Sequence, residues 1–216
     1  MRAQTRLLLS LYSLFTIVAT LILFFWFDLP VAEYFHAINQ SQLSAFFRHI
    51  TIYGEGVYWI VPFTLIYLFY RYWPDNLFPS NSFLSNNRIE RMRLAAFIAL
   101  TAFWSGLLVN LLKILFARYR PVEYFEHQLY GMSWFDVGYR QASFPSGHST
   151  TALSVAVALM LAFPRFRWLI LLAGLLVLSS RIVVTAHYFS DTVMGGYIGV
   201  MTTFYIYHRY YLKSSN

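Results

Sequence analysis

The sequence contains no cysteine. This absence excludes disulfide bonds and metal sites built from thiolates, and it leaves no redox evidence about the cellular compartment. Charged side chains are also scarce, at 12% of the 216 residues, against about 25% in a soluble globular domain. So few charges cannot cover a water-exposed surface of this size, which indicates a membrane protein.

The sequence has few acidic residues, 9 against 16 basic ones, and a net charge of +7. A basic protein binds nucleic acid through a patch or stripe of positive charge. The basic residues here are dispersed along the chain, so we exclude a nucleic-acid partner. Hydrophobic residues make up 58% of the chain and aromatic residues 20%. The length predicts a single integral-membrane domain spanning residues 1–216.

Six apolar stretches approach the length that a helix needs to cross a bilayer, about 20 residues. They cover residues 7–27, 54–70, 94–116, 147–163, 168–186 and 191–207. The first is too long for a signal peptide and no small-residue cleavage site follows it, so we expect a retained anchor. The predicted fold class is all-α, a polytopic membrane helical bundle with about six transmembrane helices.

The segments between these stretches differ in character. In residues 28–50 apolar side chains recur at helical spacing, which predicts an amphipathic helix or helix pair in the membrane interface. This segment is either a gate for substrate or a packed connector. Residues 71–93 and 118–144 are predicted to be loops, and Glu55 is expected mainly to begin a helix. Gly195, Gly196 and Gly199 predict close helix packing.

His187 and Asp191 are four residues apart, so on a helix they would share one face within hydrogen-bonding reach. A carboxylate that fixes the imidazole tautomer leaves the other ring nitrogen free to attack phosphorus. Arg181, six residues before His187, can bring a guanidinium to bind the phosphate oxygens. The alternative for such a pair is a local structural bond.

Lys113 and Arg120 are seven residues apart, and they share a face if the helix continues through Ala117. Together with Arg181 they would place three cations around one oxyanion. Ionisable residues near a membrane span usually mark function. Lys113 alone is equally explained by reaching toward lipid headgroups, and we expect Arg118 to do so.

Ser146 and Gly147 precede a predicted helix, so their backbone N–H groups can point at a phosphate. The Ser146 hydroxyl is a further donor. His148, at the start of that helix, is placed to protonate a leaving oxygen as a general acid. The alternative is that it caps or packs the helix.

Three motifs follow in order: Lys113-x6-Arg120-Pro121, Pro145-Ser146-Gly147-His148 and Ser180-Arg181-x5-His187-x3-Asp191. Their order and spacing resemble the type-2 phosphatidic acid phosphatase family, and the first ninety residues contribute no motif. The resemblance implies a reaction without metal or other cofactor. It implies His187 as nucleophile, Asp191 as its orienting group and His148 as general acid. The residues that would hold the phosphate are Lys113, Arg120, Ser146, Gly147 and Arg181. The residue pattern also favours a reaction without metal, since we expect no carboxylate cluster able to hold a divalent ion.

The family resemblance implies a phosphatase acting on a membrane lipid phosphate or pyrophosphate. Candidate substrates are undecaprenyl pyrophosphate, phosphatidylglycerophosphate, phosphatidic acid and the phosphates of lipid A. A lipid phosphotransferase with the same site is an alternative. A vanadate-dependent haloperoxidase-like enzyme and a non-enzymatic phospholipid binder are weaker alternatives.

The distribution of basic residues predicts the orientation of the chain, because cytoplasmic loops are enriched in Lys and Arg. With cytoplasmic termini, ten of the 16 Lys and Arg residues lie inside. These ten are Arg2, Arg6, Arg71, Arg88, Arg91, Arg93, Arg165, Arg167, Arg209 and Lys213. All three motifs then lie on the extracytoplasmic side of a bacterial-type inner (plasma) membrane.

Overall fold

The computed structural model describes residues 3–72, 88–136 and 138–211, and in these ranges the protein is a helical bundle. The long helices are α1 (Ala3–Ile22), α4 (Val57–Tyr72), α5 (Arg88–Phe116), α7 (Gly147–Ala162), α8 (Arg167–Val183) and α9 (Phe189–Ile206). The shorter helices are α2 (Asp28–Ala37), α3 (Gln42–Ile50) and α6 (Pro121–His127). Single turns are η1 (Leu23–Phe27), η2 (Thr51–Gly54), η4 (Tyr139–Gln141), η5 (Pro164–Phe166) and η6 (Tyr207–Tyr211). The predicted all-α class is confirmed.

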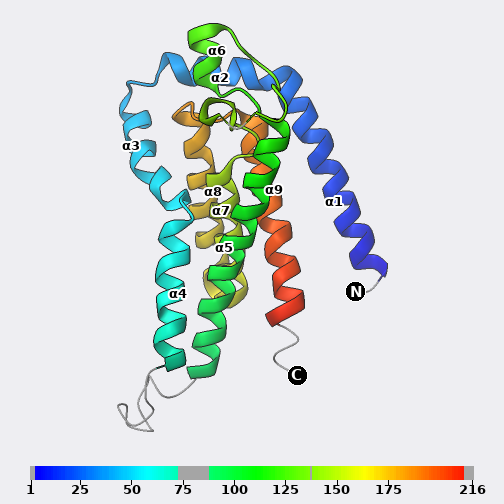
Figure 1. Cartoon of the computed structure of the whole chain (residues 1–216), viewed down its shortest axis with the longest axis vertical. Coiled ribbons are helices and arrows are strands. Elements are labelled where there is room, and N and C mark those ends of the chain that lie inside the picture. The colour runs from blue at the N-terminus through cyan, green and yellow to red at the C-terminus, as the bar shows by residue number, and fades with distance from the viewer. Residues whose placement is uncertain (1–2, 73–87, 137, 212–216) are drawn as a thin grey trace.

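Helix α7 lies at the centre of the bundle, where it packs against α5, α8 and α9. The core between α5, α7 and α9 includes Ile98, Ala102, Val155, Ala158 and Ile206. Figure 1 shows α4, α5, α7, α8 and α9 along the long axis, with α1 slanting away at the side. Because α7 is enclosed by its neighbours, the groups at its first turn are held rigidly.

Helices α7 and α9 approach each other closely through glycines. A Cβ on Gly195 would lie 2.4 Å from the Ser146 carbonyl oxygen, and one on Gly199 would lie 2.3 Å from that of Thr150. The Thr150 hydroxyl donates to the Gly195 carbonyl at 2.9 Å. The predicted close packing at these glycines is confirmed, and it brings the start of α9 against the start of α7.

The described part of the chain has four helical stretches that are long and apolar enough to cross a membrane. They are Leu7–Ala37, Gln42–Tyr72, Arg88–Phe116 and Pro164–Val183, and Gly147–Ala162 is a shorter apolar helix. The six predicted stretches correspond to α1, α4, α5, α7, α8 and α9. The number that cross the bilayer therefore stays a prediction.

Three predicted boundaries differ from the structure. The first apolar helix does not end near residue 27 but continues through η1 into α2. Residues 88–93, predicted as loop, form the first turns of α5, while residues 73–87 lie outside the described residues. The predicted loop over 118–144 contains α6 and η4, since Pro121 at the first helical position favours a helix start.

Residues 28–50 form a pair of helices, α2 and α3, which is one of the two arrangements predicted for this segment. Figure 1 shows α2 lying across one end of the bundle and α3 leading back down toward α4. Ser41 caps α3 by accepting a hydrogen bond from the Ser44 N–H at 3.2 Å. Its place at the membrane interface remains a prediction.

Candidate active site

The three motifs meet at one end of the bundle. Lys113 lies in the last turn of α5, Ser146 caps the start of α7, and Asp191 lies in the first turn of α9. The Ser146 N–H donates to the Asp191 carbonyl at 3.0 Å, and the His187 N–H donates to the Arg181 carbonyl at 3.2 Å. The structure therefore gathers residues that are up to 78 positions apart between Lys113 and Asp191 in the chain.

His187 does not share a helix with Asp191, so the helical condition stated for this pair is not met. Helix α8 ends at Val183, and α9 begins only at Phe189. Thr185 has a positive φ of 52°, a conformation that an α-helix cannot contain. His187 thus lies in the connection between the helices, with 2% of its surface exposed.

Ser143 connects His187 to Asp191. His187 Nδ1 lies 2.8 Å from the Ser143 carbonyl oxygen but 3.7 Å from Asp191 Oδ2, which is too long for a hydrogen bond. The Ser143 hydroxyl donates to the same Asp191 oxygen at 2.6 Å. The predicted direct bond between imidazole and carboxylate is wrong. Ser143 was not predicted as a site residue, because it lies outside the motifs and carries no distinguishing local pattern.

The His187 imidazole is neutral and has one nitrogen free. Burial lowers the pKa of His187 well below its ordinary value of 6.5, against the opposing effect of Asp191, and the positive charges of Arg120, Arg181 and Lys113 lower it further. A carbonyl oxygen can only accept, so Nδ1 carries the proton that is donated to Ser143. Nε2 therefore keeps its lone pair, as a nucleophile requires.

The two arginines of the site are largely buried, Arg120 at 7% and Arg181 at 8% exposure. Arg181 Nη1 donates to the Thr51 hydroxyl at 2.5 Å. Arg120 Nε donates to the Tyr139 carbonyl at 3.0 Å, and its guanidinium lies 4.1 Å from the Tyr139 ring centre. Thr51 and Tyr139, two residues outside the motifs, thus hold both cations in place.

Lys113 and Arg120 do not share a helix, because the helix does not continue through Ala117 as a shared face would require. Helix α5 ends at Phe116, and Ala117 has a positive φ of 43°. Arg120 is instead the residue that precedes α6. Arg120 nevertheless lies close enough to His187 for its positive charge to lower the pKa of the imidazole.

The start of α7 differs in detail from the expected phosphate cradle. The Ser146 hydroxyl accepts from the Ser149 N–H at 3.4 Å and from the Ser149 hydroxyl at 3.0 Å. The Ser146 N–H is already bonded to the Asp191 carbonyl. Gly147 therefore supplies the backbone donor of this pair at the helix start, and Lys113 Nζ lies 3.8 Å from the position of a Cβ on Gly147.

A cavity of about 500 Å³ opens beside Lys113 and His148. Its polar lining includes Glu55 and Asn110, and Glu55 Oε1 lies 3.9 Å from His148 Nε2. Its apolar lining comes from the start of α4, with Val57 and Ile60, and from α5, with Ala102, Phe103 and Leu107. The cavity is therefore amphipathic, and Glu55 borders the site in addition to preceding a helix.

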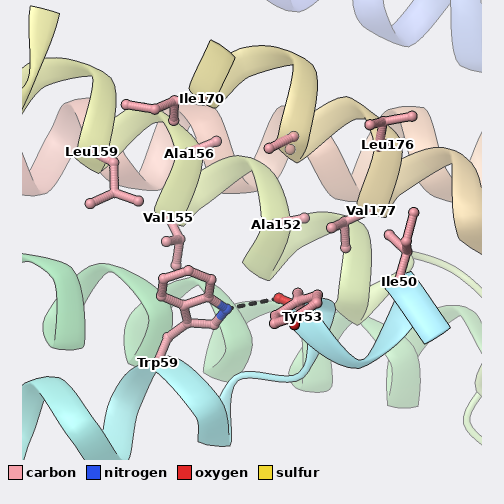
Figure 2. Close-up of a pocket in the computed structure, with 12 residues that line it drawn as sticks. Ile50, Tyr53, Trp59, Ala152, Val155, Ala156, Leu159, Ile170, Leu176 and Val177 are labelled. Carbon is pink, nitrogen blue, oxygen red and sulfur yellow. Dashed lines mark hydrogen bonds between the residues drawn. The ribbon is translucent and has the colours of Figure 1, made fainter. Parts of the chain in front are cut away.

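A second cavity, of about 380 Å³, lies between α4, α7 and α8 (Figure 2). Figure 2 shows the Trp59 side chain donating to the Tyr53 carbonyl, and this hydrogen bond is 2.8 Å long. Its lining side chains are almost all apolar, such as Val155, Leu159 and Val177. It contains none of the eight predicted site residues.

Two expectations about charged residues are wrong. Glu123, Glu126 and His127 place their ligand atoms within 4.8 Å of one another, so a carboxylate cluster does exist. Arg140 Nη1 already bonds both carboxylates, at 2.6 and 2.7 Å. Arg118 does not reach toward lipid headgroups, because its side chain is completely buried and paired with carboxylates.

The chain is similar to two curated proteins. It is 34% identical over 113 residues to a lipid A 1-phosphatase of Rhizobium etli, covering 50% of this chain and 49% of that protein. It is 36% identical over 102 residues to a lipid A 1-phosphatase of Rhizobium johnstonii, covering 47% and 42%. The chain thus matches about half or less of the length of these relatives.

A solved structure and a family also match. The crystal structure of Aquifex aeolicus LpxE aligns with 80% of this chain and 92% of its own, at 22% identity and a TM-score of 0.49. Residues 91–214, more than half of the chain and the part that carries all three motifs, match the PAP2 superfamily. The resemblance drawn from the motifs is confirmed, and the chain belongs to the PAP2 superfamily.

Proposed function

We propose that this protein is a phosphatase that removes phosphate from a phosphorylated membrane lipid through a phosphohistidine at His187. One observation carries the proposal: a neutral imidazole with a free Nε2 is buried among the charges of Lys113, Arg120 and Arg181. An uncharged nucleophile beside three cations is suited to attack a phosphate anion. Binding alone would not require a nucleophile.

The reaction has two steps. His187 Nε2 attacks phosphorus, the bond from phosphorus to the lipid oxygen breaks, and that oxygen takes the electron pair together with a proton from His148. Water then attacks the phosphohistidine, His148 accepts its proton, and the phosphorus–nitrogen bond breaks to release phosphate. Lys113, Arg120, Arg181 and the Gly147 N–H hold the phosphate oxygens and offset their charge. We therefore propose that no metal is needed.

The cavity beside Lys113 and His148 supports a lipid substrate. It has charged groups at the reacting end and apolar side chains from α4 and α5 along its walls. An amphiphile can place its phosphate beside the charged groups and the neighbouring part of the lipid against the apolar side chains. Because two relatives are lipid A 1-phosphatases, the 1-phosphate of lipid A is our first candidate. Undecaprenyl pyrophosphate, phosphatidylglycerophosphate and phosphatidic acid are the alternatives.

Phosphate release by the purified protein in detergent tests the proposal. We expect free phosphate from lipid A in the presence of a chelator, and a phosphorylated His187 peptide after rapid alkaline quenching. Phosphate appearing on a second lipid rather than in solution would favour a phosphotransferase. Halide oxidation with vanadate would favour the haloperoxidase-like alternative, and binding without turnover a lipid binder.

We propose further that the site faces away from the cytoplasm. The end of the bundle opposite the site carries basic residues such as Arg88 and Arg167, which favours a cytoplasmic location for that end. A cysteine introduced at the exposed Gln128 should react with an impermeant thiol reagent in intact cells. Labelling only after lysis would contradict this orientation.

A further inference from the structure

We infer that Asp28 and Arg118 are positioning residues that hold the Asp191 carboxylate in the orientation the His187 reaction needs. The inference rests on the proposed function of His187. Asp28 lies in α2, outside residues 91–214 that match the family, and the sequence analysis found no motif in that part of the chain. The N-terminal helices would then complete the catalytic centre in addition to anchoring the chain.

Arg118 joins two buried carboxylates. Its Nη1 donates to Asp191 Oδ1 at 2.6 Å, and its Nη2 donates to Asp28 Oδ2 at 2.7 Å. All three side chains are completely buried. A buried carboxylate without a cation would be strongly unfavourable, so the single guanidinium stabilises both.

Asp28 also holds the start of α9. Its Oδ1 accepts from the Ser190 N–H at 2.9 Å and its Oδ2 from the Ser190 hydroxyl at 2.5 Å. The Ser190 hydroxyl in turn accepts from Arg118 Nη1 at 2.7 Å. Ser190 directly precedes Asp191 in the chain. Asp28 therefore restrains the backbone next to Asp191 and also the guanidinium that binds the Asp191 carboxylate.

The Asp191 carboxylate is fixed at both oxygens. Oδ1 is bound by Arg118, while Oδ2 accepts from the Ser143 hydroxyl at 2.6 Å and from the Tyr188 N–H at 2.9 Å. The Ser143 carbonyl in turn accepts the hydrogen bond that the His187 Nδ1–H donates. A rotation of Asp191 would therefore displace Ser143 and, with it, the imidazole.

Aromatic rings keep this network dry. The Arg118 guanidinium lies 4.3 Å from the Tyr188 ring centre, 4.5 Å from that of Phe24 and 5.2 Å from that of Tyr130. The Tyr130 hydroxyl accepts from Arg118 Nη2 at 3.0 Å and donates to the Phe24 carbonyl at 2.6 Å. Exclusion of water strengthens the charged hydrogen bonds that link α2 to the site.

The test is Asp28→Asn, which keeps the size of the side chain and removes its charge. In protein shown to be monodisperse in detergent, we expect kcat for lipid A to fall about 10- to 100-fold, the loss expected when a hydrogen bond between charged groups is weakened. We expect KM to change little, because Asp28 does not border the cavity. The matched control is Glu33→Gln, an exposed carboxylate on the same helix that bonds the Tyr124 hydroxyl, and it should leave kcat unchanged.

A double mutant separates positioning from folding. If Asp28 acts through Asp191, adding Asp28→Asn to Asp191→Asn should cause little further loss of kcat. Full kcat in folded Asp28→Asn, or a multiplied loss in the double mutant, would overturn the inference. If Asp28→Asn is not recovered folded, Ser190→Ala is a milder change in the same network. The same measurements of kcat and KM on this variant, alone and combined with Asp191→Asn, then test the inference. A parent protein that never phosphorylates His187 would refute the proposed function instead, so the two failures are distinguishable.

Discussion

The carbonyl oxygen of Ser143, and not the carboxylate of Asp191, accepts the hydrogen bond from His187 Nδ1, at 2.8 Å against 3.7 Å. A backbone carbonyl cannot be removed by substitution, and it imposes the same tautomer as a carboxylate would. Asp191 acts one bond further away, through the Ser143 hydroxyl. The histidine and aspartate of the third motif are thus coupled by a residue that lies outside all three motifs.

Ser143→Ala should reduce kcat while leaving the imidazole tautomer unchanged. The variant loses the hydroxyl bond to Asp191 and keeps the carbonyl bond to His187. A hydrogen bond to a charged group contributes about 1.5–3 kcal/mol, so we expect a loss of about 10- to 100-fold. Ser133→Ala is the control, because its hydroxyl bonds the Ala117 carbonyl in the same connection. Equal activity of the two variants would show that the Ser143 hydroxyl has no part in positioning Asp191.

The two histidines should differ in how their loss depends on the leaving group. His187→Ala should abolish turnover of every substrate, since no phosphohistidine can form. General acid catalysis contributes about 10²–10⁴-fold, so His148→Ala should lose about that on a lipid monophosphate and much less on nitrophenyl phosphate. A pyrophosphate should lie between them. Equal losses on all three substrates would mean that His148 binds phosphate or positions α7.

The pH dependence should reflect the burial of His187. Burial lowers its pKa well below 6.5, so the neutral nucleophile persists as the pH falls through 6.5 and is lost only far below it. We expect kcat/KM of His148→Ala for nitrophenyl phosphate to show no acid limb near pH 6.5, after division by the separately titrated ionisation of the substrate. This background removes the general acid from the profile. A limb at pH 6.5 that belongs to the enzyme would contradict a buried nucleophile.

Gly106 should control access of lipid to the cavity. A Cβ at this position on α5 meets nothing within 4 Å, and the residue lines the cavity beside Lys113. Gly106→Ala should be tolerated and should stabilise the helix by about 0.5–1 kcal/mol. Gly106→Leu should fill the cavity and lower turnover of a long-chain lipid more than that of nitrophenyl phosphate. Equal turnover ratios in parent and Leu variant would place the lipid path elsewhere.

Gly195→Ala is the contrasting glycine variant for that experiment. Its Cβ would lie 2.4 Å from the Ser146 carbonyl, so the backbone of α7 would have to move. Both substrates should therefore lose turnover together, with less folded protein recovered. This pattern distinguishes damage to the site from a block of the lipid path.

From the amino-acid sequence we could predict the helical class, the helices that correspond to six apolar stretches, and the three motifs. These properties are local: hydrophobic runs and helix-breaking residues act within a few turns of the chain. Motif order also sufficed for the family, since Lys113, His148 and His187 stand at the expected spacings. Helical spacing did not apply to two pairs for which it required a continuous helix, Lys113 with Arg120 and His187 with Asp191. Helix α5 ends before Ala117, which has a positive φ, and α8 ends before the turn that contains Thr185.

The residues that support the site could not be predicted from local sequence patterns. Asp28 and Arg118 are 90 positions apart, and no periodicity relates them. Arg118 resembled a lipid-facing arginine in sequence, yet enclosure by Phe24, Tyr130 and Tyr188 makes it a buried partner of two carboxylates. Burial, hydrogen-bond direction and the pKa of His187 depend on which distant segments exclude water from a group. That information exists only once the helices have packed.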